Sequence, residues 1–217
     1  GIRDKLVTGV QTCALPIYGN LWKIMAMYHT YCWGGYFYLG WLPTYLQKGR
    51  GLTESEMAVM ASLPFVVGAF GNLFGGWLSD RLVKTRGLTW GRRSVGATGL
   101  ALSALFMLLA AMTPNKFMAV LFLTLGYGSM DCMLPVSWAV CLDVGRKYAG
   151  TVSGSMNMAG QLGSFASSVA FGYIVTALGG NYNAPLYPMA GMLFISAILF
   201  LFIDPTKQLI PDPQPES

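Results

Sequence analysis

The sequence has few charged residues. Only 11% of its 217 residues are Asp, Glu, Lys or Arg, whereas 54% are hydrophobic. Soluble domains usually carry about 25% charged residues. Because so little charge cannot solvate a surface on all sides, the composition excludes an ordinary water-soluble domain and favours a membrane protein.

The residues that build metal centres and active sites are also scarce. The chain has one histidine, His29, and its four cysteines show no CxxC spacing. Zinc sites and disulfide frameworks need closely grouped Cys and His residues. The sequence also lacks Gly-x-Ser-x-Gly, His-Glu-x-x-His and phosphate-loop motifs. We therefore predict no metal, no cofactor and no enzyme activity.

Long stretches without a formal charge are present instead. A helix needs about 20 apolar residues to cross a bilayer, and several uncharged stretches reach that length. The longest, Tyr148–Ile203, holds two spans divided by the turn-forming residues Gly179–Pro185. We expect an all-α integral membrane protein in which residues 18–205 form six transmembrane helices and residues 206–217 form a cytoplasmic tail. The predicted spans are approximately 22–46, 57–79, 94–112, 117–142, 149–178 and 186–203.

The basic residues are concentrated in alternate connections between these spans. Five of them lie at 81–93, and Arg146 and Lys147 lie between the fourth and fifth spans. Cytoplasmic loops are enriched in Lys and Arg, so both chain ends are predicted to face the cytoplasm of a plasma or inner membrane. The net charge of +5 therefore reflects membrane orientation, and we expect no nucleic-acid partner.

Residues 1–17 differ from the rest of the chain. They have no amphipathic period and no signal-peptide order, and they resemble the translation of a sequencing-library adapter. We interpret them as an artefact and expect the native protein to continue upstream of Tyr18. A genuine cytoplasmic linker is the alternative.

Asp131 and His29 are candidate polar sites inside the predicted spans. Asp131 shares a helix face with Pro135 and Trp138, because the spacing is i, i+4 and i+7. Charged groups inside a membrane are costly and therefore usually functional or paired. We consider a proton or substrate role for Asp131, or a structural hydrogen bond. For His29 the alternatives are a bond to a neighbouring helix and a place in a cavity.

Polar side chains also follow one face of the fifth span. They are Ser153, Asn157, Gln161, Ser164 and Ser168. Such a stripe faces either a neighbouring helix or a water-filled cavity. In the second span, Gly71 and Gly75 form a GxxxG pair, which predicts close helix packing.

The connection after the second span carries a recognisable motif. It reads Gly76-Trp77-Leu78-Ser79-Asp80-Arg81, with Arg92-Arg93 about ten residues further on. This resembles the loop pattern Gly-x-x-x-Asp-Arg/Lys-x-Gly-Arg/Lys-Arg/Lys of the major facilitator superfamily. The resemblance implies that Gly76, Asp80, Arg81, Arg92 and Arg93 belong to a cytoplasmic gate, which must open during transport.

Two further stretches narrow the resemblance to one family within this superfamily. Trp41–Leu46 and Arg146–Asn157 are similar to helices seven and ten-to-eleven of the anion:cation symporter family. That family implies the C-terminal six-helix half of a secondary transporter, whose N-terminal half is missing here. It also implies proton-coupled symport of a small organic anion, such as a sugar acid, by rocker-switch alternating access. Geometry and family position together place four residues on the substrate side. These are Tyr36, Trp138, Asn157 and Gln161.

Other functions remain open from the sequence. An organophosphate or sugar porter of the same fold is one alternative. A membrane scaffold or sensor without flux of its own is another, and a membrane-bound enzyme is a third. An upstream half with membrane carboxylates would favour transport, whereas a fused signalling domain would favour a sensor.

Overall fold

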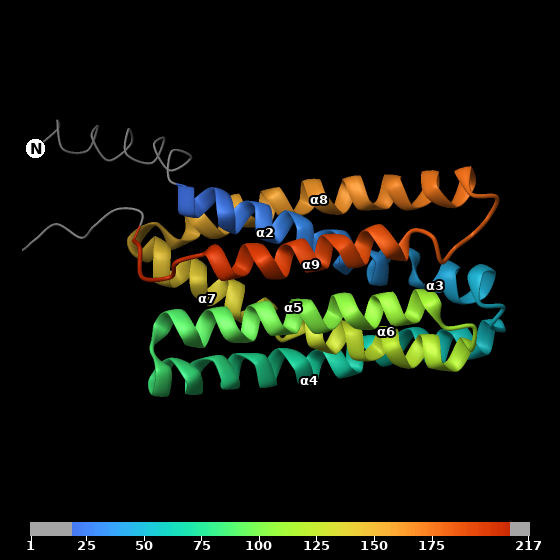
Figure 1. The fold of residues 1–217 in the computed structure, drawn as a ribbon, viewed down its shortest axis with the longest axis horizontal. Coiled ribbons are helices and arrows are strands. Elements are labelled where there is room, and N and C mark those ends of the chain that lie inside the picture. The colour runs from blue at the N-terminus through green and yellow to red at the C-terminus, as the bar shows by residue number, and fades with distance from the viewer. Residues whose placement is uncertain (1–18, 209–217) are drawn as a thin grey trace, which may run out of the picture.

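The computed structural model describes residues 19–208, and these are almost entirely helical. The predicted artefact at 1–17 and most of the predicted tail lie outside the described residues. The helical segments run in the order shown in Figure 1. They are α2 (Gly19–Tyr36), η2 (Phe37–Trp41), α3 (Leu42–Thr44), η3 (Tyr45–Gly49), α4 (Glu54–Arg86), α5 (Leu88–Met112), α6 (Lys116–Asp131), α7 (Leu134–Gly145), η4 (Arg146–Tyr148), α8 (Ala149–Ala177) and α9 (Leu186–Phe202).

These segments form long rods at the positions of the predicted spans. Helix α2 packs between α8 and α9, while α5 connects α9 to the group formed by α4 and α6. Helices α4 and α5 extend well past the predicted spans and leave only Gly87 between them. Gly87 has φ +88°, a conformation that side chains disfavour, so the chain can reverse there within one residue.

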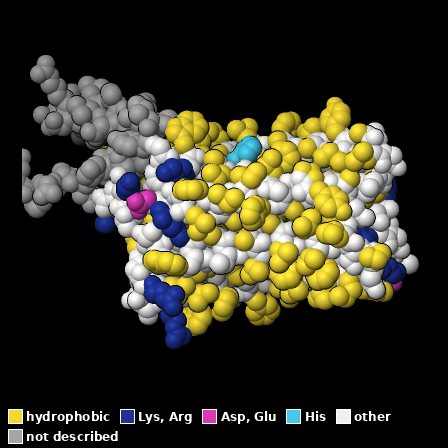
Figure 2. Space-filling model, in the orientation of Figure 1, with side chains coloured by type: hydrophobic (Ala, Val, Ile, Leu, Met, Phe, Trp, Pro, Cys, Tyr) yellow, Lys and Arg dark blue, Asp and Glu magenta, His cyan; other side chains and the backbone are white. Residues whose placement is uncertain are grey.

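Hydrophobic side chains cover much of the outside of the bundle. Large apolar side chains such as Phe70, Leu73 and Phe165 are more than two-thirds exposed, and Figure 2 shows apolar atoms spread along the length of the molecule. Three helical stretches, Glu54–Arg86, Leu88–Met112 and Lys116–Ala177, are long and apolar enough to cross a membrane. The last of them folds back on itself as two rods, α6–α7 and α8.

The GxxxG pair permits close helix packing, as predicted. A Cβ atom at Gly71 would collide with the carbonyl oxygen of Gly128, and one at Gly75 would collide with that of Cys132. Helix α4 therefore lies backbone to backbone against the end of α6. Such an approach lets van der Waals contact and weak polar contacts replace side-chain packing.

Two rods are interrupted near their middle. The rod that begins with α2 changes from α-helix to wider π-helical turns at Phe37–Trp41 and Tyr45–Gly49. The rod that begins with α6 breaks between Asp131 and Leu134, and Pro135 in the next turn has no N–H to donate. The sequence predicted one span at approximately 117–142 here, and the structure divides it into two helices, α6 and α7.

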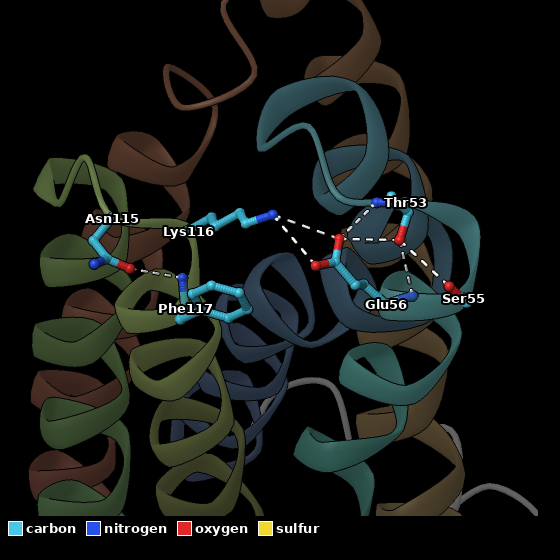
Figure 3. A network of polar contacts seen from close by, with 6 residues as sticks. All are labelled: Thr53, Ser55, Glu56, Asn115, Lys116 and Phe117. Carbon is cyan, nitrogen blue, oxygen red and sulfur yellow. Dashed lines mark hydrogen bonds and ion pairs between the residues drawn. The ribbon is translucent and has the colours of Figure 1, made fainter.

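Helix starts at the end of the bundle opposite Gly87 are capped by side chains (Figure 3). Thr53 and Glu56 form a reciprocal capping box at the start of α4. The Oδ1 atom of Asn115 accepts from the backbone N–H of Phe117, at 2.9 Å, at the start of α6. Lys116 pairs with Glu56 across a 3.5 Å gap, which links the two capped starts.

Candidate functional site

A charged cluster forms at the face of the bundle where α4 and α7 end and α5 begins. Nη1 of Arg92 donates to Oδ1 of Asp80 at 2.9 Å, and its Nε donates to Oδ2 of Asp143 at 3.0 Å. The same guanidinium donates to the hydroxyl of Ser79 at 3.0 Å. One arginine thus joins two carboxylates from two other helices. We call Ser79, Asp80, Arg92 and Asp143 the gate cluster.

The two ion pairs of Arg92 differ in their environment. The side chain of Arg92 is 11% exposed and that of Asp143 is 22% exposed, whereas that of Asp80 is 67% exposed. Exposed pairs contribute about 0–1 kcal/mol because water and salt screen them. The pair with Asp143 is therefore the stronger constraint. Charge-assisted bonds of this kind hold helix ends together and can be broken and remade.

The structure places the other predicted gate residues elsewhere. Arg81 lies over the indole of Trp77, 5.4 Å from the ring centroid. Arg93 donates through Nε to the carbonyl of Ile203, just after α9, at 2.6 Å. Gly76 faces Pro135 of α7. Of the predicted set, Asp80 and Arg92 are the two residues whose side chains pair with each other.

Ser79 and Asp143 were not predicted to belong to this site. Ser79 stands within the quoted motif, and its buried hydroxyl also donates to the carbonyl of Gly91 at 3.3 Å. Asp143 is an acidic residue three positions before the basic turn that begins at Arg146. Its position close to that turn is the signal that could have drawn attention to it.

Two of the predicted substrate-side residues touch each other. The hydroxyl of Tyr36, at the end of α2, donates to Oε1 of Gln161 on α8 at 3.2 Å. Asn157 is one turn from Gln161, and both are exposed. Trp138 is 39% exposed on α7. Exposed amides on a membrane helix point to a surface that meets water or another protein segment.

The polar stripe of α8 serves two purposes. The buried Ser164 donates to the carbonyl of Gly160 in its own helix at 2.9 Å. Asn157 and Gln161 are exposed instead. Ser167, outside the predicted stripe, donates to the carbonyl of Trp33 at 2.8 Å and so holds α8 against α2.

His29 lies at the contact between α2 and α8. Its Nδ1 is 3.0 Å from the carbonyl oxygen of Ala159, so Nδ1 carries the proton in this contact. Gly163 leaves room for the backbone of His29, since a Cβ there would collide with the His29 carbonyl. This geometry fits a bond to a neighbouring helix.

Asp131 occupies the break between α6 and α7. It is 9% exposed, and its carboxylate has no hydrogen bond or ion pair with any residue of the described range 19–208. A Cβ at Gly68 would approach its Oδ2 to 2.8 Å, so the carboxylate lies against α4. It also stands at the negative end of the α6 dipole. The structural hydrogen bond considered from the sequence is not found there.

A second polar network joins three segments at the opposite end of the bundle. Arg50 donates through Nε to the hydroxyl of Tyr45 at 2.7 Å and through Nη1 to the carbonyl of Thr113 at 2.6 Å. The Tyr45 hydroxyl in turn donates to Asn183 Oδ1 at 3.1 Å. A cation at the carbonyl end of α5 also offsets the helix dipole.

Comparison with known proteins identifies the family. The profile of the Major Facilitator Superfamily matches residues 24–217. The chain belongs to the Major Facilitator Superfamily. This confirms the resemblance seen in the loop motif, and a family of transporters agrees with the expectation that the chain is no enzyme.

Similar proteins are named as transporters of sulfoacetate, galactarate/D-glucarate and ascorbate. A probable sulfoacetate transporter of Cupriavidus necator is 34% identical over 190 residues, which are 87% of this chain and 44% of the relative. A probable galactarate/D-glucarate transporter of Bacillus subtilis is 33% identical over 183 residues, covering 81% of this chain and 38% of the relative. An ascorbate transporter of Arabidopsis thaliana chloroplasts is 29% identical over 156 residues, which cover 71% of this chain and 29% of the relative. The chain thus spans less than half the length of these relatives.

Membership in the superfamily makes this a multi-pass membrane protein. It also relates the gate cluster to the loop motif of the superfamily. The cluster sits in the family motif, at the junction of α4 and α5. It is completed by Asp143 from the end of α7. Contacts within one six-helix unit can therefore hold this face of the bundle together.

Proposed function

We propose that this chain is the C-terminal half of a secondary transporter that carries a small organic anion together with protons. The observation that carries the proposal is the Arg92 bridge, which joins Asp80 and Asp143 at one membrane face. Rocker-switch transport needs contacts that hold one face closed and release when the halves rotate. The bridge lies within this half, so it would hold the helix ends of one gate face in place, and its exposed pair with Asp80 would be the first to release when the halves rotate.

The proposed substrate is a sugar acid or a similar small carboxylate or sulfonate. Relatives are named for sulfoacetate and galactarate/D-glucarate, which carry anionic groups. Tyr36, Asn157 and Gln161 offer neutral hydrogen-bond groups of the kind that hydroxyls need. The indole of Trp138 offers a flat apolar surface. We expect the N-terminal half to cover these residues and to supply positive charge.

The proposed coupling ion is a proton, with Asp131 as the group in this half that binds it. A buried carboxylate without a partner is costly while it is charged, and protonation removes the cost. Its place at a helix break beside Gly68 lets a shift of α4 against α6 change its surroundings. The His29–Ala159 contact favours a structural role for His29.

The distribution of charge supports a membrane orientation. Figure 2 shows basic side chains gathered at the end of the molecule where α2 begins, and cytoplasmic loops are rich in Lys and Arg. The gate cluster lies at that end of the bundle. We therefore propose that both chain ends face the cytoplasm of the cell membrane and that the gate cluster closes the cytoplasmic side.

Transport by the complete protein in liposomes tests this function. Labelled sulfoacetate and D-glucarate are offered under an inward proton gradient, with and without a protonophore. We expect one of these anions to accumulate and the protonophore to abolish accumulation. Uptake of a sugar phosphate or a neutral sugar instead would establish the alternative porter. A folded protein with no flux of any of these compounds would favour the scaffold or sensor.

A further inference from the structure

A basic cavity lies at the end of the bundle where α2 and α5 begin and α9 ends. It has a volume of about 570 Å³, and within residues 19–208 it is lined by Lys23, Arg93 and Lys207 together with one carboxylate, Asp204. Three cations against one carboxylate leave the cavity positive. The proposed transport mechanism uses neither this cavity nor its residues.

The hydrogen bonds of the cavity leave much of its positive charge available. Arg93 uses only Nε, on the carbonyl of Ile203, so both terminal amino groups of its guanidinium are without a hydrogen-bonding partner in the described range. Lys23 makes one long bond, 3.4 Å, to the carbonyl of Phe202. Asp204 accepts from the backbone N–H and hydroxyl of Thr206, which lowers the pKa of this carboxyl. Lys207 is 3.9 Å from Asp204 and 76% exposed.

An apolar groove meets this cavity at Arg93. The groove has a volume of about 310 Å³ and includes Trp90 of α5 and Leu201 of α9. Trp90 is 65% exposed and Leu201 is 49% exposed. Leu105 of α5 and Ile198 of α9 are exposed as well. Arg93 therefore stands between a cationic cavity and a surface that suits a hydrocarbon chain.

We propose that this place binds one anionic glycerophospholipid of the cytoplasmic leaflet. The phosphodiester would meet the free amino groups of Arg93, which bind phosphate oxygens well. Lys23 and Lys207 would surround the headgroup, and an acyl chain would lie along Trp90 and Leu201. Basic pockets between membrane helices on the cytoplasmic side suit anionic headgroups, and tryptophan favours this depth of the membrane.

The lipid explains the site better than a soluble anion does. A free phosphate would use the cations but not the apolar groove that starts at the same arginine. The cavity also joins the first and last helices of the six-helix unit, since Asn20 of α2 donates to the carbonyl of Asp204 at 2.8 Å. A bound lipid would therefore strengthen the contact between α2, α5 and α9.

Native mass spectrometry of the complete purified protein tests the proposal. The protein is titrated with phosphatidylglycerol or phosphatidylcholine in detergent, and retained lipid is counted. We expect one phosphatidylglycerol to be retained in preference to phosphatidylcholine. Each cation near an anionic lipid contributes about a fivefold gain in affinity, so Lys23→Gln should weaken retention by about that factor and Arg93→Gln by more. The exposed Lys84, at the end of α4, supplies the control Lys84→Gln, which should retain lipid normally.

Further variants and a competitor keep the test decisive. Trp90→Ala leaves the cations in place and should still reduce retention, because the acyl chain loses its contact. Equal retention of both lipids, or normal retention by both Lys23→Gln and Arg93→Gln, would overturn the proposal. Displacement of the lipid by millimolar inorganic phosphate would assign the cavity to a soluble anion instead. If Arg93→Gln unfolds, Lys23→Gln and Trp90→Ala decide the outcome.

Discussion

Arg92 and Asp143 are 51 residues apart in the chain, and yet the Nε of Arg92 lies 3.0 Å from Oδ2 of Asp143. The contact joins the start of α5 to the end of α7 at the face where α4 also ends. It is more enclosed than the neighbouring contact of Arg92 with Asp80. The gate cluster therefore has an inner and an outer ion pair, and the two should respond differently to substitution.

Removing the inner pair should open the gate face more than removing the outer one. Asp143→Asn, in the complete protein, should increase the labelling rate of a cysteine placed on the cytoplasmic side and reduce uptake several-fold. Asp80→Asn should have a smaller effect, because an exposed pair contributes about 0–1 kcal/mol. Arg92→Gln removes both pairs and should lower the free energy of unfolding by about 1–3 kcal/mol. Unchanged labelling and unchanged uptake in Asp143→Asn and Asp80→Asn would remove the gate assignment.

The substrate-side residues should affect uptake without affecting folding. Asn157→Ala deletes an exposed amide and should lower uptake of the transported anion, with expression unchanged. Met158 is the next residue and is 57% exposed, so Met158→Leu is a matched control that should transport normally. Tyr36→Phe removes the bond to Gln161 and should raise the KM for substrate. Normal uptake by Asn157→Ala would show that this face is not part of the cavity.

Substitution of Asp131 should separate coupling from translocation. Asp131→Asn keeps the size of the side chain but removes the charge that a proton would neutralise. We expect accumulation driven by a proton gradient to be lost, while exchange of labelled for unlabelled substrate continues. Loss of both activities in a folded protein would indicate a structural role, and retention of gradient-driven accumulation would exclude Asp131 as the proton site.

The close approach of α4 and α6 makes a prediction about stability. Gly71→Ala places a methyl group against the carbonyl of Gly128 and should lower the free energy of unfolding by about 1–3 kcal/mol, as overpacking usually does. It should appear as a lower thermal midpoint in detergent. Gly154 of α8 has nothing within 4 Å of an added Cβ, so Gly154→Ala should leave the midpoint unchanged or raise it slightly. Equal midpoints for the two variants would mean that the helices can separate at little cost.

Asp131 illustrates what could be predicted about the candidate site. Its position inside a predicted span was evident because hydropathy is a local property of the sequence. The alternative of a structural hydrogen bond could not be decided, since it depends on which helix lies opposite. The structure puts Gly68 there, which offers no side chain to bond with. For His29, the opposite helix supplies the carbonyl of Ala159, and the structural interpretation fits.

The sequence by itself determined the membrane class, the positions of the long helices and the superfamily motif, because apolar length, charge spacing and turn residues act over short distances. It also indicated the close approach at Gly71 and Gly75, since small residues four apart permit it on any helix. Only the tertiary structure decided which partner each polar group has. Arg92 pairs with Asp143, while Arg81 and Arg93 turn to Trp77 and Ile203. Those pairings depend on which helix ends meet in space, which the order of residues along one helix does not specify.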